Sequence, residues 1–278
     1  MKRVVTLQDI SCAGKCSISV ALPVLSCLET ETVVIPTSLL SNHTAFESYT
    51  LFDLSDMTGP LADGLEKSGF AFDAVYTGYI GSKKQVREIF SFIERFRRTG
   101  SLLIVDPAMA DDGQLYSGLS VDHSKDMLSL VRIADVIIPN ITEACMLLDT
   151  EYRQPEQFTE AEIRDMLRSL AGLGPGKVII TGVHTDKDSI GAMCFDRDRD
   201  SFSISVRKKH PGTYLGTGDI FASVITGCLL AGKQLESAME SAVSFISLCI
   251  EQTEADPEKR WYGVSFEKCL YLLHELVY

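Results

Sequence analysis

The chain lacks the long apolar run that a membrane-spanning helix requires. About 18 consecutive apolar residues are needed to cross a bilayer, and charged or polar residues interrupt every apolar stretch of this 278-residue chain well before that length. Residues 1–7 include two basic side chains, but Gln8 and Asp9 follow before the apolar core of a signal peptide could form. We therefore expect no membrane partner, and we predict that the chain begins with a β-strand.

Paired metal-binding cysteines are also missing. The eight cysteines are scattered, with no C-x-x-C motif and no pair of histidines at metal-binding spacing. Most of them lie within apolar periodic segments, where a free thiol packs as a small hydrophobic side chain. The pattern argues against a zinc site and against a disulfide framework, and it predicts a reducing, cytoplasmic compartment.

Positive charge is scarce. The chain has 26 Lys and Arg against 38 Asp and Glu, which gives a net charge of −12. The resulting field repels polyanions, so nucleic acid is excluded as the main partner. A small anion in a locally positive pocket remains compatible with this charge.

Short β-branched strands alternate with amphipathic helices along the first two thirds of the chain. This alternation is typical of βαβ units around a parallel sheet, and no break in composition marks a second domain within residues 1–278. Loops are expected at 8–14 and 37–50. Strands are predicted at 3–7, 32–36, 74–77, 102–105, 136–138 and 177–181, and helices at 15–28, 61–67, 83–98, 124–131, 142–148 and 160–170. The sequence therefore predicts an α/β fold with a mainly parallel sheet.

The pattern changes after residue 181. Two alternating segments, 190–195 and 202–206, flank a charged turn and predict an antiparallel hairpin at a sheet edge. Three further helices are expected, at 220–230, 235–252 and 266–277.

A glycine-rich segment, Gly216-Thr217-Gly218-Asp219, directly precedes an apolar helical run. Free N–H groups at the start of a helix attract anions. An aspartate there would repel a phosphate unless it had a separate task, such as accepting a proton from an attacking hydroxyl. The alternative is that Asp219 only caps the helix.

Polar residues follow every predicted parallel strand, where ligands collect in such sheets. They are Gln8, Asp9 and Ser11; Ser41, Asn42, His43 and Thr44; Gly78 and Tyr79; Asp106 and Asp111; Asn140 and Glu143; Thr181 and Gly182. Singly, each could serve a turn, a cap or a loop. Together, the carboxylates and the glycine-rich segment supply Mg²⁺ ligands, an anion cradle and a base, which are the parts that phosphoryl transfer requires. The basic residues 207–210 are either a solvated strand end or a positive contribution to a nucleotide site.

These motifs resemble the ribokinase-like superfamily. The resemblance rests on Gly216–Asp219, on Asn140-x-x-Glu143 and on Asp106-Pro107, and residues 41–44 are similar to the substrate loop of the pyridoxal kinase branch. Residues 9–17 and 20–23 look like bacterial pyridoxamine kinases. The resemblance implies a three-layer αβα sandwich without a separate lid domain, a homodimer, and ATP-dependent phosphorylation of the 5′-hydroxymethyl group of a vitamin B6 vitamer.

The resemblance also implies roles for individual residues. Asp219 would be the base, and Gly216, Thr217 and Gly218 would form the anion hole. Asn140 and Glu143 would organise Mg²⁺, and Asp106 would help to hold a metal or a monovalent cation such as K⁺. Thr181, Gly182 and Asp111 would lie beside the nucleotide, while Asp9, Ser11, Ser41, His43, Thr44 and Tyr79 would surround the pyridine ring.

The chain departs from the family pattern at Asp9, where many pyridoxal kinases have serine after the glutamine. Either Asp9 or Ser11 could contact the ring nitrogen. Residues 112–125 resemble a flap over the site but contain no cysteine, so no covalent hemithioacetal to an aldehyde is expected there.

Three other functions remain open at this stage. A hydroxymethylpyrimidine kinase of thiamine synthesis would share the fold and the glycine-rich segment. A vitamer-binding protein without turnover would keep the pocket alone. A dinucleotide-dependent oxidoreductase is disfavoured, because no G-x-G-x-x-G motif follows the first strand.

Overall fold

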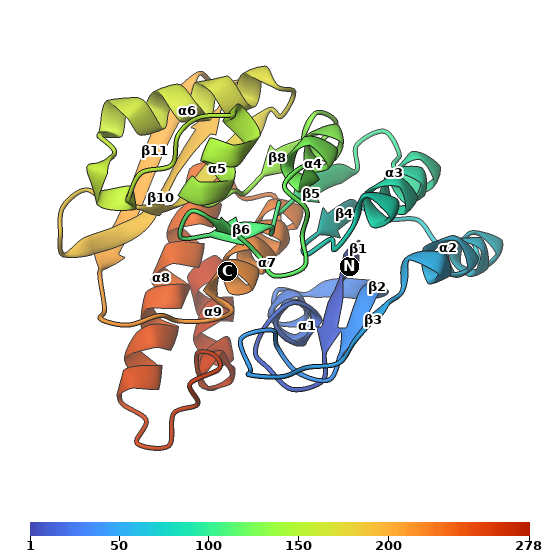
Figure 1. Cartoon of the computed structure of the whole chain (residues 1–278), viewed down its shortest axis with the longest axis horizontal. Coiled ribbons are helices and arrows are strands. Elements are labelled where there is room, and N and C mark those ends of the chain that lie inside the picture. The colour runs from blue at the N-terminus through green and yellow to red at the C-terminus, as the bar shows by residue number, and fades with distance from the viewer.

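A computed structural model describes all residues 1–278. It contains one nine-stranded sheet with the order β11-β10-β9-β8-β5-β4-β1-β2-β3 (Figure 1). Six neighbouring strands, β2, β1, β4, β5, β8 and β9, are parallel to one another. Strand β3 is antiparallel at one edge of the sheet, and the antiparallel pair β10 and β11 forms the other edge. The strands are β1 Lys2–Ser11, β2 Thr30–Leu40, β3 Leu51–Asp53, β4 Ala74–Thr77, β5 Leu102–Val105, β8 Val136–Ile137, β9 Lys177–Val183, β10 Ser189–Asp196 and β11 Ser201–Lys208.

Nine α-helices cover both faces of the sheet (Figure 1). They are α1 Ile18–Cys27, α2 Thr58–Lys67, α3 Lys83–Phe96, α4 His123–Val131, α5 Ile141–Leu148, α6 Glu160–Gly172, α7 Thr217–Leu230, α8 Leu235–Glu254 and α9 Leu270–Val277. No helix is long and apolar enough to cross a membrane.

The side chains of the central strands alternate between two hydrophobic cores. Val5 and Val75 belong to the core beneath α2–α6, whereas Val4 and Ala74 belong to the core beneath α1 and α7–α9. This alternation follows from the two-residue period of a strand. Because both faces are buried, the parallel strands consist of nearly continuous apolar residues rather than an alternating pattern. The predicted three-layer α/β sandwich is confirmed.

The edge hairpin is confirmed as well. Strands β10 and β11 pair antiparallel, with Phe195 opposite Phe202 and their rings stacked at 4.5 Å between centroids. All eight cysteines are free, and only Cys12 is exposed. The last predicted helix begins later than expected, because Phe266–Lys268 forms a 3₁₀ turn before α9.

Two expected loops were wrong in part. Strand β1 continues to Ser11, because Ile10 and Ser11 pair with Leu39 and Leu40 of β2 after a register shift. Strand β2 therefore also runs to Leu40, inside the expected 37–50 loop, and β3 returns antiparallel beside its end. Polar side chains obscure the periodicity of these residues, and pairing with the neighbouring strand overrides their weak local preference.

A small hairpin was not predicted at all. It consists of β6, Ala110–Asp111, and β7, Gln114–Leu115, and it stands apart from the main sheet. Its turn places Asp112 and Gly113 at positive φ. The Gly113 N–H donates to the Thr142 hydroxyl at 3.0 Å, which ties the hairpin to the start of α5.

Candidate functional site

A cavity of about 540 Å³ opens at the carboxyl ends of the parallel strands. It brings together Asp9, Ser11, His43, Thr44, Tyr79, Asp106, Asp111, Asn140, Glu143, Thr181, Gly182, Gly216, Thr217, Gly218 and Asp219. These are the predicted site residues with one exception. Ser41 does not line the cavity: its hydroxyl donates to Asn42 Oδ1 and accepts the Thr50 N–H, so it stabilises the loop instead.

The glycine-rich segment forms the start of α7, as expected. Gly216 adopts φ +80°, and a Cβ added there would lie 1.9 Å from the Lys15 carbonyl oxygen. Only glycine fits this position without displacing the backbone. Since the first N–H groups of a helix have no partner within the helix, those of α7 remain available to an anion in the cavity.

Asp219 lies in the first turn of α7, but it does not cap the helix. The N-cap residue is Gly216, and no side-chain cap bond is present. Burial raises the pKa of Asp219 to about 7, with a further contribution from Asp9, although the nearby Ser17 N–H acts in the opposite direction. The alternative of a helix cap is therefore wrong. A carboxylate with this pKa is suited to accept a proton near neutral pH.

Glu143 is buried and joins two segments of the chain by hydrogen bonds. Its carboxylate accepts the N–H groups of Met109 at 2.9 Å, Ala110 at 3.4 Å and Asn140 at 2.9 Å. Asn140 Oδ1 accepts the Glu143 N–H in return, which completes a capping box at the start of α5. The predicted cap is thus present at the same residues that face the cavity. Burial raises the pKa of Glu143 to about 7 despite these three donors.

Asp106 completes an acidic group with Glu143 and Asp219. Its side chain is buried, and burial together with repulsion by the other two carboxylates raises its pKa well above the usual range. No cluster of three or more His, Cys, Asp or Glu could bind a metal by the protein alone. Mg²⁺ prefers a few carboxylates with phosphates and waters, so mutually repelling carboxylates that line this cavity fit a metal that arrives with a nucleotide.

Asp9 and Ser11 belong to a single hydrogen-bonded group. Asp9 is buried at the end of β1 and accepts hydrogen bonds from Ser17 Oγ and from Ser11 Oγ, the latter at 3.2 Å. Burial raises the pKa of Asp9 in spite of these donors. Ser17, which the sequence did not single out, therefore belongs to this group through its hydroxyl, and its N–H lies near enough to Asp219 to lower the pKa of that carboxyl.

His43 and Tyr79 line the same cavity as this group. His43 Nδ1 accepts the Ala45 N–H at 3.0 Å, so the proton of the neutral imidazole resides on Nε2. Burial lowers the pKa of His43, and it raises the pKa of Tyr79 to about 12. Both side chains are thus neutral at pH 7, and each offers a hydrogen-bond donor.

The basic segment borders the opposite side of the cavity. Arg207 pairs with Glu240 and donates to Ser244 Oγ at 2.7 Å, and Lys209 Nζ lies 2.7 Å from Glu156 Oε1. Lys208 forms no ion pair, although it lines the same cavity. Lys208 is thus the cation of this segment that is free to meet an anionic ligand.

Other lining residues were missed from the sequence. Val243, Ile246 and Ile250 project from α8 and form an apolar wall of the cavity. Their helical spacing is visible in the sequence, but a helix face that packs into the hydrophobic core has the same spacing, so the cavity wall could not be predicted from it. Tyr116 follows β7 and also lines the cavity.

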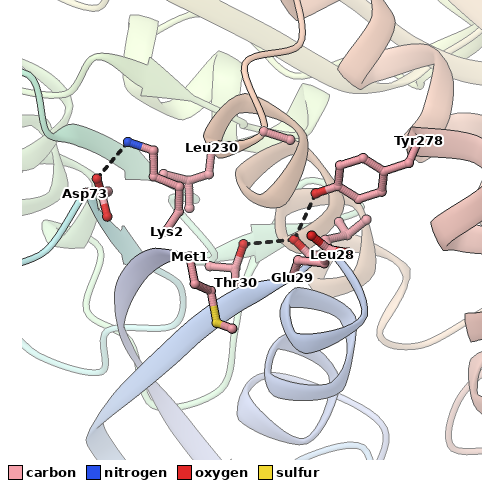
Figure 2. A pocket seen from close by; sticks show the side chains of 9 residues that line it. Met1, Lys2, Leu28, Glu29, Thr30, Asp73, Leu230 and Tyr278 are labelled. Carbon is pink, nitrogen blue, oxygen red and sulfur yellow. Dashed lines mark hydrogen bonds and ion pairs between the residues drawn. The ribbon is translucent and has the colours of Figure 1, made fainter.

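A second cavity, of about 400 Å³, lies near the start of β1 (Figure 2). None of the predicted site residues lines it. Lys2 pairs with Asp73 at 2.8 Å, and the hydroxyls of Thr30 and Tyr278 donate to the Leu28 carbonyl oxygen (Figure 2). Lys2, Asp73, Thr30 and Tyr278 are thus already engaged in an ion pair or in hydrogen bonds to the backbone, which leaves the larger cavity as the candidate site.

Several known proteins are similar to this chain in sequence and in architecture. A family model described as phosphomethylpyrimidine kinase matches residues 65–262. A pyridoxine/pyridoxal/pyridoxamine kinase from Bordetella avium is 30% identical over 252 residues, covering 87% of this chain and 82% of the relative. A Bacteroides thetaiotaomicron protein assigned as a phosphomethylpyrimidine kinase, crystallised with pyridoxal, is 35% identical with a TM-score of 0.93 over 98% of this chain and 95% of its own. Pyridoxal kinase from Lactobacillus plantarum is 31% identical with a TM-score of 0.89, covering 99% and 98% of the two chains.

Proposed function

The chain belongs to the phosphomethylpyrimidine kinase family, in the pyridoxal kinase branch of the ribokinase-like superfamily, and we propose that it phosphorylates the 5′-hydroxymethyl group of a vitamin B6 vitamer. As a member of this family it is an ATP-dependent kinase. The observation that carries the proposal is one cavity in which the Asp219 carboxylate and the start of α7 face the Asp9 group. A phosphoryl acceptor and an anionic donor can meet there.

Asp219 removes the proton of the vitamer hydroxyl as its oxygen attacks the terminal phosphoryl group of ATP. The N–H groups of Gly216, Thr217 and Gly218 then stabilise the negative charge on the transferred group. Since Asp219 has a pKa of about 7, it is matched to proton transfer near neutrality.

Asp106 is the direct metal ligand that the geometry supports best. Both oxygens of Glu143 already accept N–H groups, so Glu143 would act on metal-bound waters together with Asn140. Bound Mg²⁺ would neutralise charge on the phosphates. Asp106 is also the candidate for a monovalent cation, while Thr181, Gly182 and Asp111 border the nucleotide side of the cavity.

Two further features belong to the proposal, and of these only the homodimer rests on the family resemblance alone. We propose a homodimer, which sedimentation of the purified chain can test. We also propose that the chain works in a reducing compartment, consistent with its eight free cysteines.

The substrate assignment can be tested by ADP release with pyridoxal, pyridoxamine, pyridoxine and hydroxymethylpyrimidine supplied in parallel. We expect kcat/KM for at least one of the three vitamers to exceed that for hydroxymethylpyrimidine by tenfold or more, about 1.4 kcal/mol. Calorimetric binding of each compound in the absence of ATP provides the control. Binding without ADP release would instead identify a vitamer-binding protein.

A hydroxymethylpyrimidine kinase is the second candidate, because the matching family model is described as a phosphomethylpyrimidine kinase. The same parallel assay decides between the two. Preferential turnover of the pyrimidine would move the chain to this function.

Lys208→Ala is expected to raise the KM for ATP by about fivefold, since an unpaired cation beside the phosphates contributes about 1 kcal/mol. Lys209→Ala is the matched control. Because Lys209 is already paired with Glu156, its loss should change the KM for ATP by less than about twofold. Steady-state kinetics with varied ATP measure both values. Equal effects of the two variants would contradict a special role for Lys208.

A further inference from the structure

Three aromatic side chains join the loop that carries His43 and Thr44 to the segment after α8. The ring of Phe46 lies 4.5 Å from that of Trp261 and 5.5 Å from that of Tyr262, measured between centroids. Trp261 and Tyr262 meet edge to face at 5.8 Å. We call Phe46, Trp261 and Tyr262 the aromatic clasp.

Phe46 is coupled closely to His43 on the first side of the clasp. The Phe46 N–H donates to the His43 carbonyl oxygen at 3.0 Å, and the Ala45 N–H donates to His43 Nδ1 at 3.0 Å. The His43 N–H in turn donates to the Ala13 carbonyl oxygen at 2.8 Å. A displacement of Phe46 would therefore be transmitted to the imidazole in the cavity.

The other side of the clasp is anchored by Lys15. Its Nζ donates to the Val264 carbonyl oxygen at 3.0 Å and pairs with Glu267 at 2.8 Å. Gly263 lies against the same side chain, since an added Cβ would stand 2.4 Å from Lys15 Cβ. The Lys15 carbonyl in turn faces Gly216, so the segment that carries Trp261 shares its support with the start of α7.

The clasp is not part of either hydrophobic core. Trp261 is 60% exposed, and none of the three rings belongs to the core clusters. Its contacts therefore contribute little to global stability. An aromatic pair contributes about 0.5–1.5 kcal/mol beyond its buried area, which is enough to shift the position of a surface loop.

We infer that the aromatic clasp positions the substrate loop. Phe46, held against Trp261 and Tyr262, fixes His43 and Thr44 at the cavity for the vitamer, and none of the three rings lines the cavity itself. Phe46 is thus a positioning residue, and this inference rests on the proposed function.

The test compares Phe46→Ala with the unaltered chain. Trp261 is the only tryptophan, so its emission reports the clasp directly. Phe46→Ala is expected to shift this emission to longer wavelength and to increase its quenching by acrylamide. The Kd for pyridoxamine, measured by calorimetry without ATP, and the KM for pyridoxamine should each rise about tenfold, whereas kcat and the KM for ATP change less than threefold.

Two further variants keep the result interpretable. Phe52→Ala removes a phenylalanine of neighbouring β3 that is more exposed (60%) than the half-buried Phe46 and stacks on no other ring, and it should leave emission and Kd unchanged. Phe46→Tyr retains an aromatic ring at this position and should have the same Trp261 emission and the same Kd for pyridoxamine as the unaltered chain. If Phe46→Ala binds pyridoxamine with the original Kd, the positioning role is overturned even though turnover persists. Binding of the vitamers without turnover of any of them by the unaltered chain would overturn the proposed function and leave the Kd comparison valid, while absence of binding of all three vitamers would overturn both.

Discussion

Asp219→Asn is expected to lower kcat by about 10²- to 10⁴-fold, because the loss of a general base removes about 3–5 kcal/mol of transition-state stabilisation. The variant should remain folded. Asp219 does not cap α7, and its raised pKa means that the ionised carboxylate is disfavoured by burial. Above pH 7 the substitution replaces a buried negative charge by a neutral amide and so removes the free-energy cost of burying that charge. The melting temperature at pH 8 should therefore not fall. Steady-state kinetics and thermal unfolding at the same pH measure both effects.

The pH dependence provides an independent check of this residue. The pKa of Asp219 is raised from 3.8 to about 7, so the carboxylate is protonated below that pH and cannot accept the substrate proton. The kcat/KM of the unaltered enzyme is therefore expected to rise as the pH increases through about 7. Glu143 titrates in the same range, and the Asn variant separates the two. Retention of the full pH profile by Asp219→Asn would assign the titration to Glu143.

Gly216→Ala is expected to destabilise the protein by about 2–4 kcal/mol. The new Cβ would collide with the Lys15 carbonyl oxygen at 1.9 Å, and φ +80° is a strained conformation for alanine. Because the obstruction is backbone rather than a flexible side chain, either the start of α7 or the segment around Lys15 must move. Urea unfolding should show a lower midpoint, and activity should fall with it.

Gly218→Ala is the matched control within the same segment. No atom lies within 4 Å of the added Cβ, and φ is not in the left-handed region, so stability should change by less than about 0.5 kcal/mol. Activity should nevertheless fall, because Gly218 lines the cavity at the proposed anion hole. Full activity of a stable Gly218→Ala protein would contradict that placement, and an unaltered midpoint for Gly216→Ala would contradict the collision.

The sequence by itself determined the order of the helices and of the strands that form the parallel part of the sheet, the edge hairpin and the residues at the ends of the parallel strands. These features are encoded locally. Apolar periodicity identifies the elements, and a parallel sheet must bring its carboxyl ends to one edge. The residues from Asp9 to Asp219 therefore converge on one cavity as predicted, with Ser41 as the exception because its side chain turns back to the loop.

Tertiary structure alone decided which of these residues act together. The sequence left Asp9 and Ser11 as alternatives, yet the fold joins them through a hydrogen bond and adds Ser17, whose hydroxyl also donates to Asp9. The fold also distinguishes Lys208 from Lys209. Lys209 pairs with Glu156, which is distant in sequence but close in space, whereas Lys208 forms no ion pair.

The pairing of Phe46 with Trp261 has the same origin. Such contacts depend on packing between segments far apart in the chain, and no local pattern of residues encodes them. The sequence thus determined the chemical groups available to the site, and the tertiary structure determined their partners.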